Sequence, residues 1–232
     1  MRALFSTLLK TAAYDLSNTS TGYWVKKILD TFGIITHLNP NTSDAHIILR
    51  QIYHILKPLN KDLIRDCGVR NLLIKNDMGP NKPFFPNHGW YKGDEVALNA
   101  DMFYHPDQPD DFYDFRGYFL SRPQETLYHE FGHSYDARHN DLSLQEPWLR
   151  LSGWNQTYKP GLKRLIIQET GAPEIIGEWF YNPSAGFTRF YGKRNPYDDW
   201  ADCFAFFVGG LKSKLPANKI DYFKNLLKKY SS

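Results

Sequence analysis

The sequence has few cysteines: only Cys67 and Cys203 occur among its 232 residues. Two thiols are too few for a disulfide framework or for a metal site built from thiolates. We therefore expect both cysteines to be buried as free thiols rather than joined in a bridge.

The sequence also lacks a long apolar run and a large net charge. No apolar stretch approaches the length of a membrane span, and the one near the N-terminus ends at Lys10, as in an amphipathic helix rather than a signal peptide. The net charge of +3 gives no reason to expect nucleic acid or an anionic membrane as a partner. These features predict a cytoplasmic protein and leave its oligomeric state open.

Aromatic residues are abundant, with 16 phenylalanines, 15 tyrosines and 6 tryptophans. Most such side chains fill protein cores, and a chain of this length can bury a substantial core. No internal repeat, low-complexity segment or domain boundary is apparent in the sequence. We therefore expect residues 1–232 to form a single domain.

The order of apolar patterns predicts helices, then strands, then helices. Helical spacing is expected over residues 1–16, 21–33 and 44–58, and strands over 71–77 and 94–104. Further helices are expected over residues 123–140, 196–210 and 220–227. This order indicates an α+β fold with a small sheet. The N-terminal half, residues 1–121, would supply the sheet, and the C-terminal half, residues 122–232, would be mainly helical.

The stretch HEFGHSYDARHN, residues 129–140, is the strongest functional signal. Residues four apart on a helix lie one turn apart, so the imidazoles of His129 and His133 can bind one metal ion. Glu130 between them can reach a water molecule at that ion. The apolar side of the same helix is expected to face the core through Leu127, Phe131 and Ala137.

The third metal ligand is not fixed by this motif. One candidate is His139, because residues 129–139 match the pattern H-E-x-x-H-x-x-G-x-x-H of the metzincin peptidases everywhere except at Asp136, where metzincins have glycine. Metzincins also have a methionine turn after the motif. All the methionines of this chain precede His129, so the metzincin pattern fails that test: Met1, Met78 and Met102.

Carboxylates further along the chain are the other candidates. Asp198 and Asp202 lie four apart on an expected helix, so one can bind the metal while the other supports a metal-bound histidine from behind. Asp199 between them is expected to be solvated. Two imidazoles, one carboxylate and an open position form the usual ligand set of catalytic zinc.

Tyr191 stands seven positions before Asp198 and is followed by Gly192. With HEFGH and the segment DDWAD, this spacing resembles the HEFGH gluzincin zinc metallopeptidases, which include the anthrax lethal factor catalytic domain and the Pro-Pro endopeptidases. The resemblance covers residues 122–208. It implies a zincin-like metallopeptidase domain in which a small mixed sheet accompanies the active-site helix.

The resemblance also implies the roles of individual residues. Zn2+ would be held by His129, His133 and Asp198, with Glu130 as general base and Tyr191 as oxyanion stabiliser. The supporting acid would be Asp202. The family's third ligand is glutamate, whereas aspartate is one methylene shorter. The second helix must therefore approach more closely, or Asp202 must take over as the ligand.

The expected function is a zinc metalloendopeptidase acting on a peptide or protein. In many such enzymes a strand before the active helix forms the upper rim of the cleft, and the substrate pairs with it as an extended strand. Residues 94–104 are the expected rim, and the acidic residues of the following loop are expected to be solvated: Asp107, Asp110, Asp111 and Asp114. The alternative is an inactive zinc-containing binding or scaffold module. Nucleophilic hydrolysis through Ser134 is disfavoured, because Ser134 and its neighbour His133 face different ways on a helix.

Overall fold

The structure is a computed structural model that describes residues 20–38, 44–75, 89–104, 120–169, 172–175 and 178–231. For residues 166–169 and 172–175 it describes the backbone alone. The helix expected over residues 1–16 and the acidic residues of the 105–114 loop lie outside the described residues.

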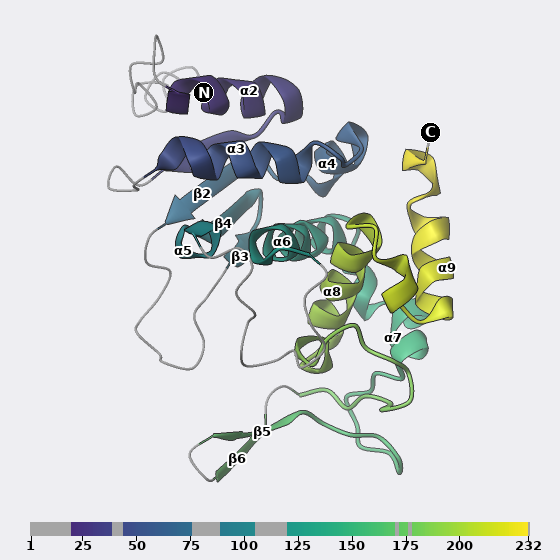
Figure 1. The fold of residues 1–232 in the computed structure, drawn as a ribbon. Helices are drawn as coiled ribbons and strands as arrows, with labels where there is room; N and C mark the ends of the chain where they lie inside the picture. The colour runs from purple at the N-terminus through teal and green to yellow at the C-terminus, as the bar shows by residue number, and fades with distance from the viewer. Residues whose placement is uncertain are drawn as a thin grey trace.

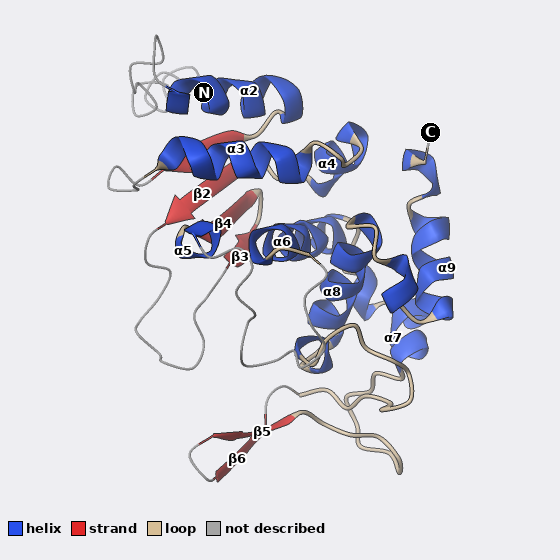
Figure 2. Cartoon of the chain, in the orientation of Figure 1, coloured by secondary structure: helices blue, strands red, loops and turns tan. Residues whose placement is uncertain are grey.

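The described residues form an α+β fold with a mainly helical C-terminal half, as the sequence predicts (Figures 1 and 2). The helices are α2 (Ser20–Phe32), α3 (Ala45–Leu56), α4 (Lys61–Cys67), α5 (Asp101–Tyr104), α6 (Arg122–Arg138), α7 (Glu146–Ser152), α8 (Pro196–Val208) and α9 (Ala217–Leu226). The strands are β1 (Ile35–Leu38), β2 (Asn71–Lys75), β3 (Gly89–Lys92), β4 (Glu95–Asn99), β5 (Ile166–Glu169) and β6 (Ala172–Ile175). The hairpin of β5 and β6 extends away from the other elements (Figure 1).

The main sheet is mixed, and its four strands lie in the order β1-β2-β4-β3. The strands β1, β2 and β4 are parallel, whereas β3 runs antiparallel to β4. Its centre is apolar because β2 buries Leu72 and Ile74 in alternation and β4 buries Val96, Ala97 and Leu98 in succession. On the outer side of β3, no further strand pairs with it within the described residues.

The structure differs from the predicted strands at two places. Residues 94–104 were expected to form one strand, but the strand ends at Asn99, whose side-chain oxygen accepts a hydrogen bond from the Asp101 backbone N–H at 3.0 Å and so begins α5. Residues 89–92 lie outside both predicted strands, but they form β3. A two-residue turn with a left-handed Gly93 (φ 68°) joins β3 to β4.

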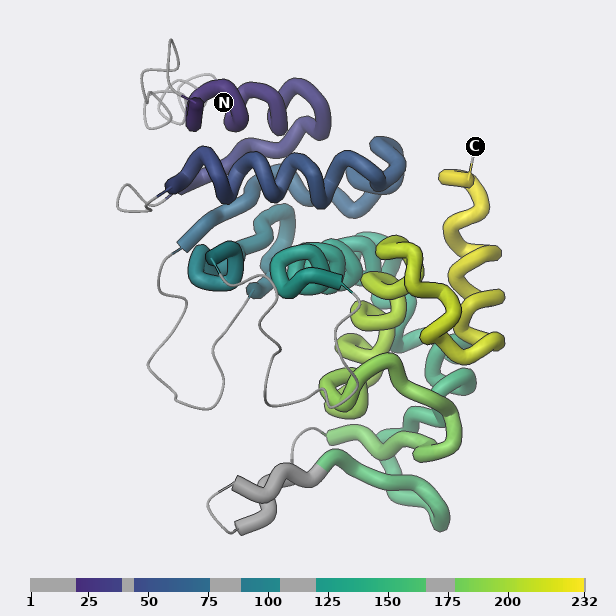
Figure 3. Tube along the Cα trace, in the orientation of Figure 1, coloured from purple at the N-terminus to yellow at the C-terminus, as the bar shows by residue number. Residues whose placement is uncertain are grey.

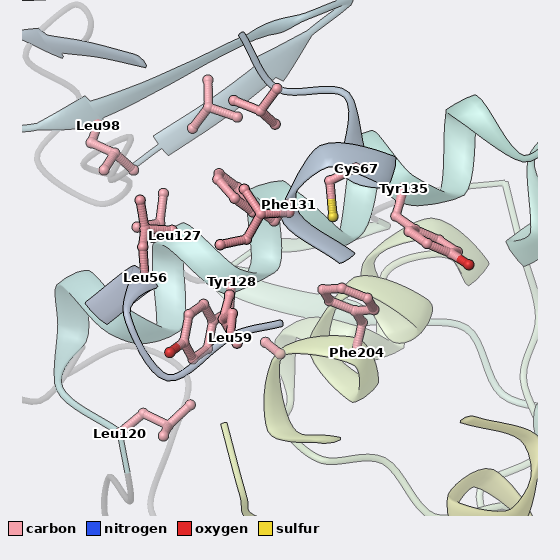
Figure 4. Close-up of a cluster of buried hydrophobic side chains, with 14 of the residues drawn as sticks. Leu56, Leu59, Cys67, Leu98, Leu120, Leu127, Tyr128, Phe131, Tyr135 and Phe204 are labelled. Atoms are coloured by element: carbon pink, nitrogen blue, oxygen red, sulfur yellow. The ribbon is translucent and has the colours of Figure 1, made fainter. Parts of the chain in front are cut away.

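The helix α6 lies between the sheet and α8 (Figure 1). Its apolar side chains point into the main core, where they meet residues from α3, α4, β4 and α8 (Figure 4). Leu127 and Phe131 are buried as expected. The expectation for Ala137 is wrong, because this residue lies in the last turn of α6 and is exposed at the edge of a cavity.

The ends of the C-terminal helices follow the sequence signals. Pro196 stands in the first turn of α8, and the side chain of Asn195 accepts a hydrogen bond from the Asp198 backbone N–H at 2.8 Å. The chain after α9 runs back beside the end of α4 (Figure 3), where Lys229 donates to Asp66 at 2.7 Å.

The two cysteines are buried and free, as expected. None of the helices in the described ranges is long and apolar enough to cross a membrane.

Candidate metal centre

The helices α6 and α8 bring His129, His133 and Asp198 together. One ligand atom from each lies within 4.8 Å of the others, so this group could hold a metal ion. His129 Nε2 is 2.9 Å from His133 Nε2, and Asp198 Oδ1 is 3.7 Å from the first nitrogen and 3.4 Å from the second. Ligands of tetrahedral zinc lie roughly 3.4 Å apart, given metal–ligand distances of about 2.0–2.2 Å. The donor set and its spacing therefore fit such an ion.

The short side chain of Asp198 reaches this group because the two helices pack unusually closely. A Cβ atom added to Gly132 would lie 3.0 Å from the Ala201 Cα and 3.2 Å from the Ala201 carbonyl oxygen. Gly132 is the glycine of HEFGH, so the motif itself allows the backbone of α8 to approach. An aspartate ligand, one methylene shorter than glutamate, would need such a close approach.

Asp202 lies behind His129 rather than in the ligand group. Its Oδ1 is 2.7 Å from His129 Nδ1, and its side chain is fully buried. A carboxylate only accepts, so His129 Nδ1 carries the proton and its Nε2 faces His133 and Asp198. Burial opposes a positive charge on His129, but hydrogen bonds to Asp198 and Asp202 favour it more strongly and raise its pKa to about 10. Binding a metal would therefore release a proton.

A cavity of about 440 Å³ opens beside the two histidines. Glu130 lines it and is nearly buried, which raises the pKa of its carboxyl group. Four aromatic side chains contribute walls: Trp90, Tyr91, Tyr191 and Tyr197. A proton-accepting carboxylate thus adjoins a possible metal site in a space that is large enough for part of a peptide.

Tyr191 faces the same cavity from the short 3-10 helix η2 (Tyr191–Lys193). Its ring centroid lies 5.7 Å from that of His129. Burial and the negative charge of Asp198 raise the pKa of its phenol, so the hydroxyl keeps its proton at neutral pH. Arg194 Nη1 donates to the Tyr191 hydroxyl oxygen at 2.5 Å. Tyr191 therefore has a protonated hydroxyl group and lines the cavity beside the possible metal site.

The other candidate ligand, His139, has different partners. Its ring stacks on Tyr135 with centroids 3.9 Å apart, and its Nε2 lies 3.3 Å from Asp66 Oδ2. Asp136, at the glycine position of the metzincin pattern, remains helical and accepts two hydrogen bonds from Ser143, at 2.7 and 2.6 Å. Left-handed residues occur only later, at Asn140 and Asp141, so the turn does not return His139 to the ligand group.

Two residues next to the possible metal ligands, Asp199 and Ser134, are buried and have polar partners. Asp199 was expected to be solvated, but it is fully buried and accepts from Lys219 Nζ at 2.7 Å. The expectation is wrong because successive helical residues point about 100° apart, which turns Asp199 toward α7 and α9. Ser134, disfavoured as a nucleophile, is buried and donates to the Cys67 carbonyl oxygen at 2.5 Å.

The strand at the cavity is β3, not the strand expected over residues 94–104. Gly89, Trp90 and Tyr91 of β3 line the cavity, whereas β4 lies inside the sheet between β2 and β3. A Cβ atom on Gly89 would lie 2.7 Å from the Thr126 methyl carbon and 3.1 Å from Glu130. The glycine therefore lets β3 lie directly against α6.

Residues that the sequence did not single out complete the surroundings of the site. Arg189 pairs with both Glu125 and Asp202, and Arg194 contacts Tyr191. The partners of Arg189 are distant in the sequence, so no spacing signal indicates them, whereas Arg194 stands three residues after Tyr191 and four before Asp198.

Comparison with known proteins gives no family. No protein-family model matches the chain, and no curated protein is significantly similar to it. The resemblance to HEFGH gluzincins therefore rests on the motifs, and the function has to be argued from the geometry of the site.

Proposed function

We propose that the protein is a zinc-dependent metalloendopeptidase with a zincin-like domain. The observation that carries this proposal is the convergence of His129, His133 and Asp198 beside a cavity that also contains Glu130 and Tyr191. Two imidazole nitrogens and one carboxylate are a set that catalytic zinc uses, with one position left for solvent or substrate. Each group that peptide hydrolysis needs then has a candidate residue.

Peptide hydrolysis would depend on the metal and on the chain's own residues as follows. Bound zinc would supply a water molecule whose pKa is lowered to about 7 and would polarise the scissile carbonyl. Glu130 would accept the proton of the attacking water and pass it to the departing amine. Tyr191 would donate a hydrogen bond to the developing oxyanion, a contact whose loss typically costs about 100-fold or more in turnover. Asp202 would hold the ring of His129 in place.

The edge strand β3 supports a peptide as the substrate. Its residues line the cavity, and its outer edge is unpaired within the described part of the chain. An extended peptide can add to such an edge through main-chain hydrogen bonds, while its side chains enter the neighbouring pockets. We propose that the substrate binds along β3 with its scissile carbonyl directed toward Glu130 and Tyr191.

The test compares the wild type with Glu130→Gln, and with Glu146→Gln as a control whose side chain is 72% exposed. Zinc content is measured by mass spectrometry, and cleavage is measured on a broad peptide library. We expect about one zinc per chain in all three proteins, and cleavage by the wild type and Glu146→Gln only. A wild type that takes up no zinc after supplementation would contradict the proposal. A fully loaded wild type that cleaves nothing would favour the inactive scaffold module.

A further inference from the structure

An ion-pair network lies behind His129, on the side away from the possible metal. Arg189 donates from Nη1 to Glu125 Oε1 and from Nη2 to Asp202 Oδ1. The side chains are 14%, 5% and 0% exposed for Arg189, Glu125 and Asp202, so these pairs are shielded from solvent. Removing one member of such a network is costly, because a buried carboxylate that loses its cation keeps its charge with nothing to offset the cost of burial.

The network joins three parts of the site through one guanidinium group. Asp202 Oδ1, the oxygen that Arg189 contacts, is also the oxygen that His129 Nδ1 contacts. Glu125 stands on α6 one turn before His129. Arg189 itself lies two positions before Tyr191, and its guanidinium carbon is 5.6 Å from the centroid of the Tyr191 ring. The side chain thus fixes α6, α8 and the Tyr191 segment relative to one another.

We infer that Arg189 is a positioning residue for both His129 and Tyr191, acting through Asp202 and through its own place in the chain. The tyrosine half of this inference rests on the proposed function, whereas the histidine half requires only that the site binds a metal. A guanidinium can donate to two carboxylates at once because its N–H groups form a rigid planar fork. Without it, Asp202 would lose the partner that aims its carboxylate at His129.

The experiment compares Arg189→Met and Arg189→Lys with a matched control, Lys219→Met. Lys219 is also a buried cation; it lies on α9 and pairs with Asp199, which stands on α8 three residues before Asp202. Three quantities are measured: the melting temperature of the zinc-free protein, the zinc dissociation constant by chelator competition, and the absorption spectrum after cobalt substitution. If the wild type cleaves a peptide, kcat is added.

We expect Arg189→Met to weaken zinc binding roughly tenfold, at the lower end of the range for residues that support metal ligands. The cobalt spectrum should change with it, because the orientation of His129 changes. Arg189→Lys should recover only part of the affinity, since an ammonium group does not form the same fork. Lys219→Met should lower the melting temperature but leave the zinc dissociation constant and the spectrum unchanged.

Equal weakening of zinc binding by Arg189→Met and Lys219→Met would overturn the inference, because Arg189 would then act only through stability. If Arg189→Met does not fold, Arg189→Lys decides: zinc affinity equal to that of the wild type overturns the inference. A wild type that binds zinc but cleaves nothing contradicts the proposed peptidase, while the zinc measurements still test Arg189. A wild type that binds no zinc contradicts both.

Discussion

The helix α8 carries two buried aspartate–cation pairs whose partners lie on different elements. Asp199 faces α7 and α9 and is saturated: Lys219 contacts both its oxygens, and Ser152 and Trp154 donate to it as well. Asp202 faces α6, where its Oδ1 is shared by Arg189 and His129. Its Oδ2 is buried without a hydrogen-bond partner among the described residues.

This difference separates a structural pair from a candidate functional one. A saturated buried carboxylate has all the contacts it can use, and it fixes the packing of the helices around it. An incompletely satisfied one is costly to the fold and is expected mainly where function requires it. The comparison therefore predicts that the Asp199 side governs stability, and that the Asp202 side governs metal binding and chemistry.

The largest expected effect is the loss of stability when the Asp199–Lys219 pair is broken. Lys219→Met removes one partner of a fully buried pair and leaves Asp199 uncompensated. The free energy of unfolding, measured by urea denaturation of the zinc-free protein, should fall by about 3–5 kcal/mol. Adding Asp199→Asn should restore part of this loss, because the unpaired charge is removed. A loss below about 1 kcal/mol would show that the pair is not structural in the sense proposed.

The next effect belongs to the catalytic side. Tyr191→Phe removes the hydroxyl that would donate to the oxyanion, so kcat should fall about 100-fold or more. The zinc dissociation constant should stay the same, because Tyr191 is not among the grouped ligands. Tyr222→Phe is the control, since Tyr222 lies on α9 and its hydroxyl accepts from Trp200 of α8 at 3.4 Å. An equal loss of kcat in both variants would remove Tyr191 from the mechanism.

Asp202→Asn tests the same contrast within α8 itself. The substitution keeps the shape of the side chain but weakens its hold on His129 Nδ1, so zinc affinity should fall about 10- to 100-fold. Asp199→Asn, three residues earlier, should lower the melting temperature while the zinc affinity of the folded protein stays unchanged. Titration calorimetry on both variants distinguishes them. Weaker zinc binding by Asp199→Asn but not by Asp202→Asn would contradict the roles assigned to the two aspartates.

The parts of the site that could be predicted from the sequence are those fixed by helix geometry. Four-residue spacing places His129 above His133 and Asp198 near Asp202, whatever the rest of the chain does. The spacing also predicted that one aspartate would stand behind a histidine, and the structure assigns this place to Asp202. Local periodicity therefore predicts a site that lies on two helices.

The parts that could not be predicted depend on contacts between distant segments. Glu125 and Arg189 are 64 residues apart, and Asp199 and Lys219 are 20 apart, so no periodic pattern links them. The burial of Asp199 depends on α7 and α9, which only the tertiary packing places. The edge strand is different, because the sequence itself contains a hairpin signal, Gly93–Asp94, between β3 and β4. The fold class was predictable, but the identity of the cavity wall required this turn to be recognised.

The close contact between the two helices gives a smaller effect on stability. Gly132→Ala places a methyl group 3.0–3.3 Å from atoms of Ala201. Overpacking typically costs about 1–3 kcal/mol, and the better helix propensity of alanine returns up to about 1 kcal/mol. The net loss in unfolding free energy should be about 1 kcal/mol. Zinc affinity should fall as well, because α8 moves away and Asp198 is short. Unchanged zinc affinity would show that Asp198 does not depend on this approach.

A third aspartate, Asp66, is partly exposed, so its ion pair should contribute less to stability than the two buried pairs of α8. Asp66 contacts Lys229, Tyr230 and His139 at the end of α4, and its side chain is 32% exposed. Burial opposes ionisation of Asp66, but hydrogen bonds from Lys229 and Tyr230 outweigh it and lower its pKa from the ordinary value of 3.8. The ionised form is therefore stabilised by folding. This contribution is present above about pH 4 and is lost as the pH falls further, because the unfolded chain takes up the proton first.

Asp66→Asn should therefore lower the melting temperature at about pH 7, and this difference from the wild type should shrink toward about pH 3. Solvent screening limits the effect to less than about 1 kcal/mol. Asp62→Asn is the control: Asp62 pairs with Arg65 on the same helix, and both side chains are more than 70% exposed. A difference for Asp66→Asn that persists unchanged in acid would mean that the side chain acts through packing rather than charge. Asp66 would then provide no exposed ion pair to compare with the two buried pairs of α8.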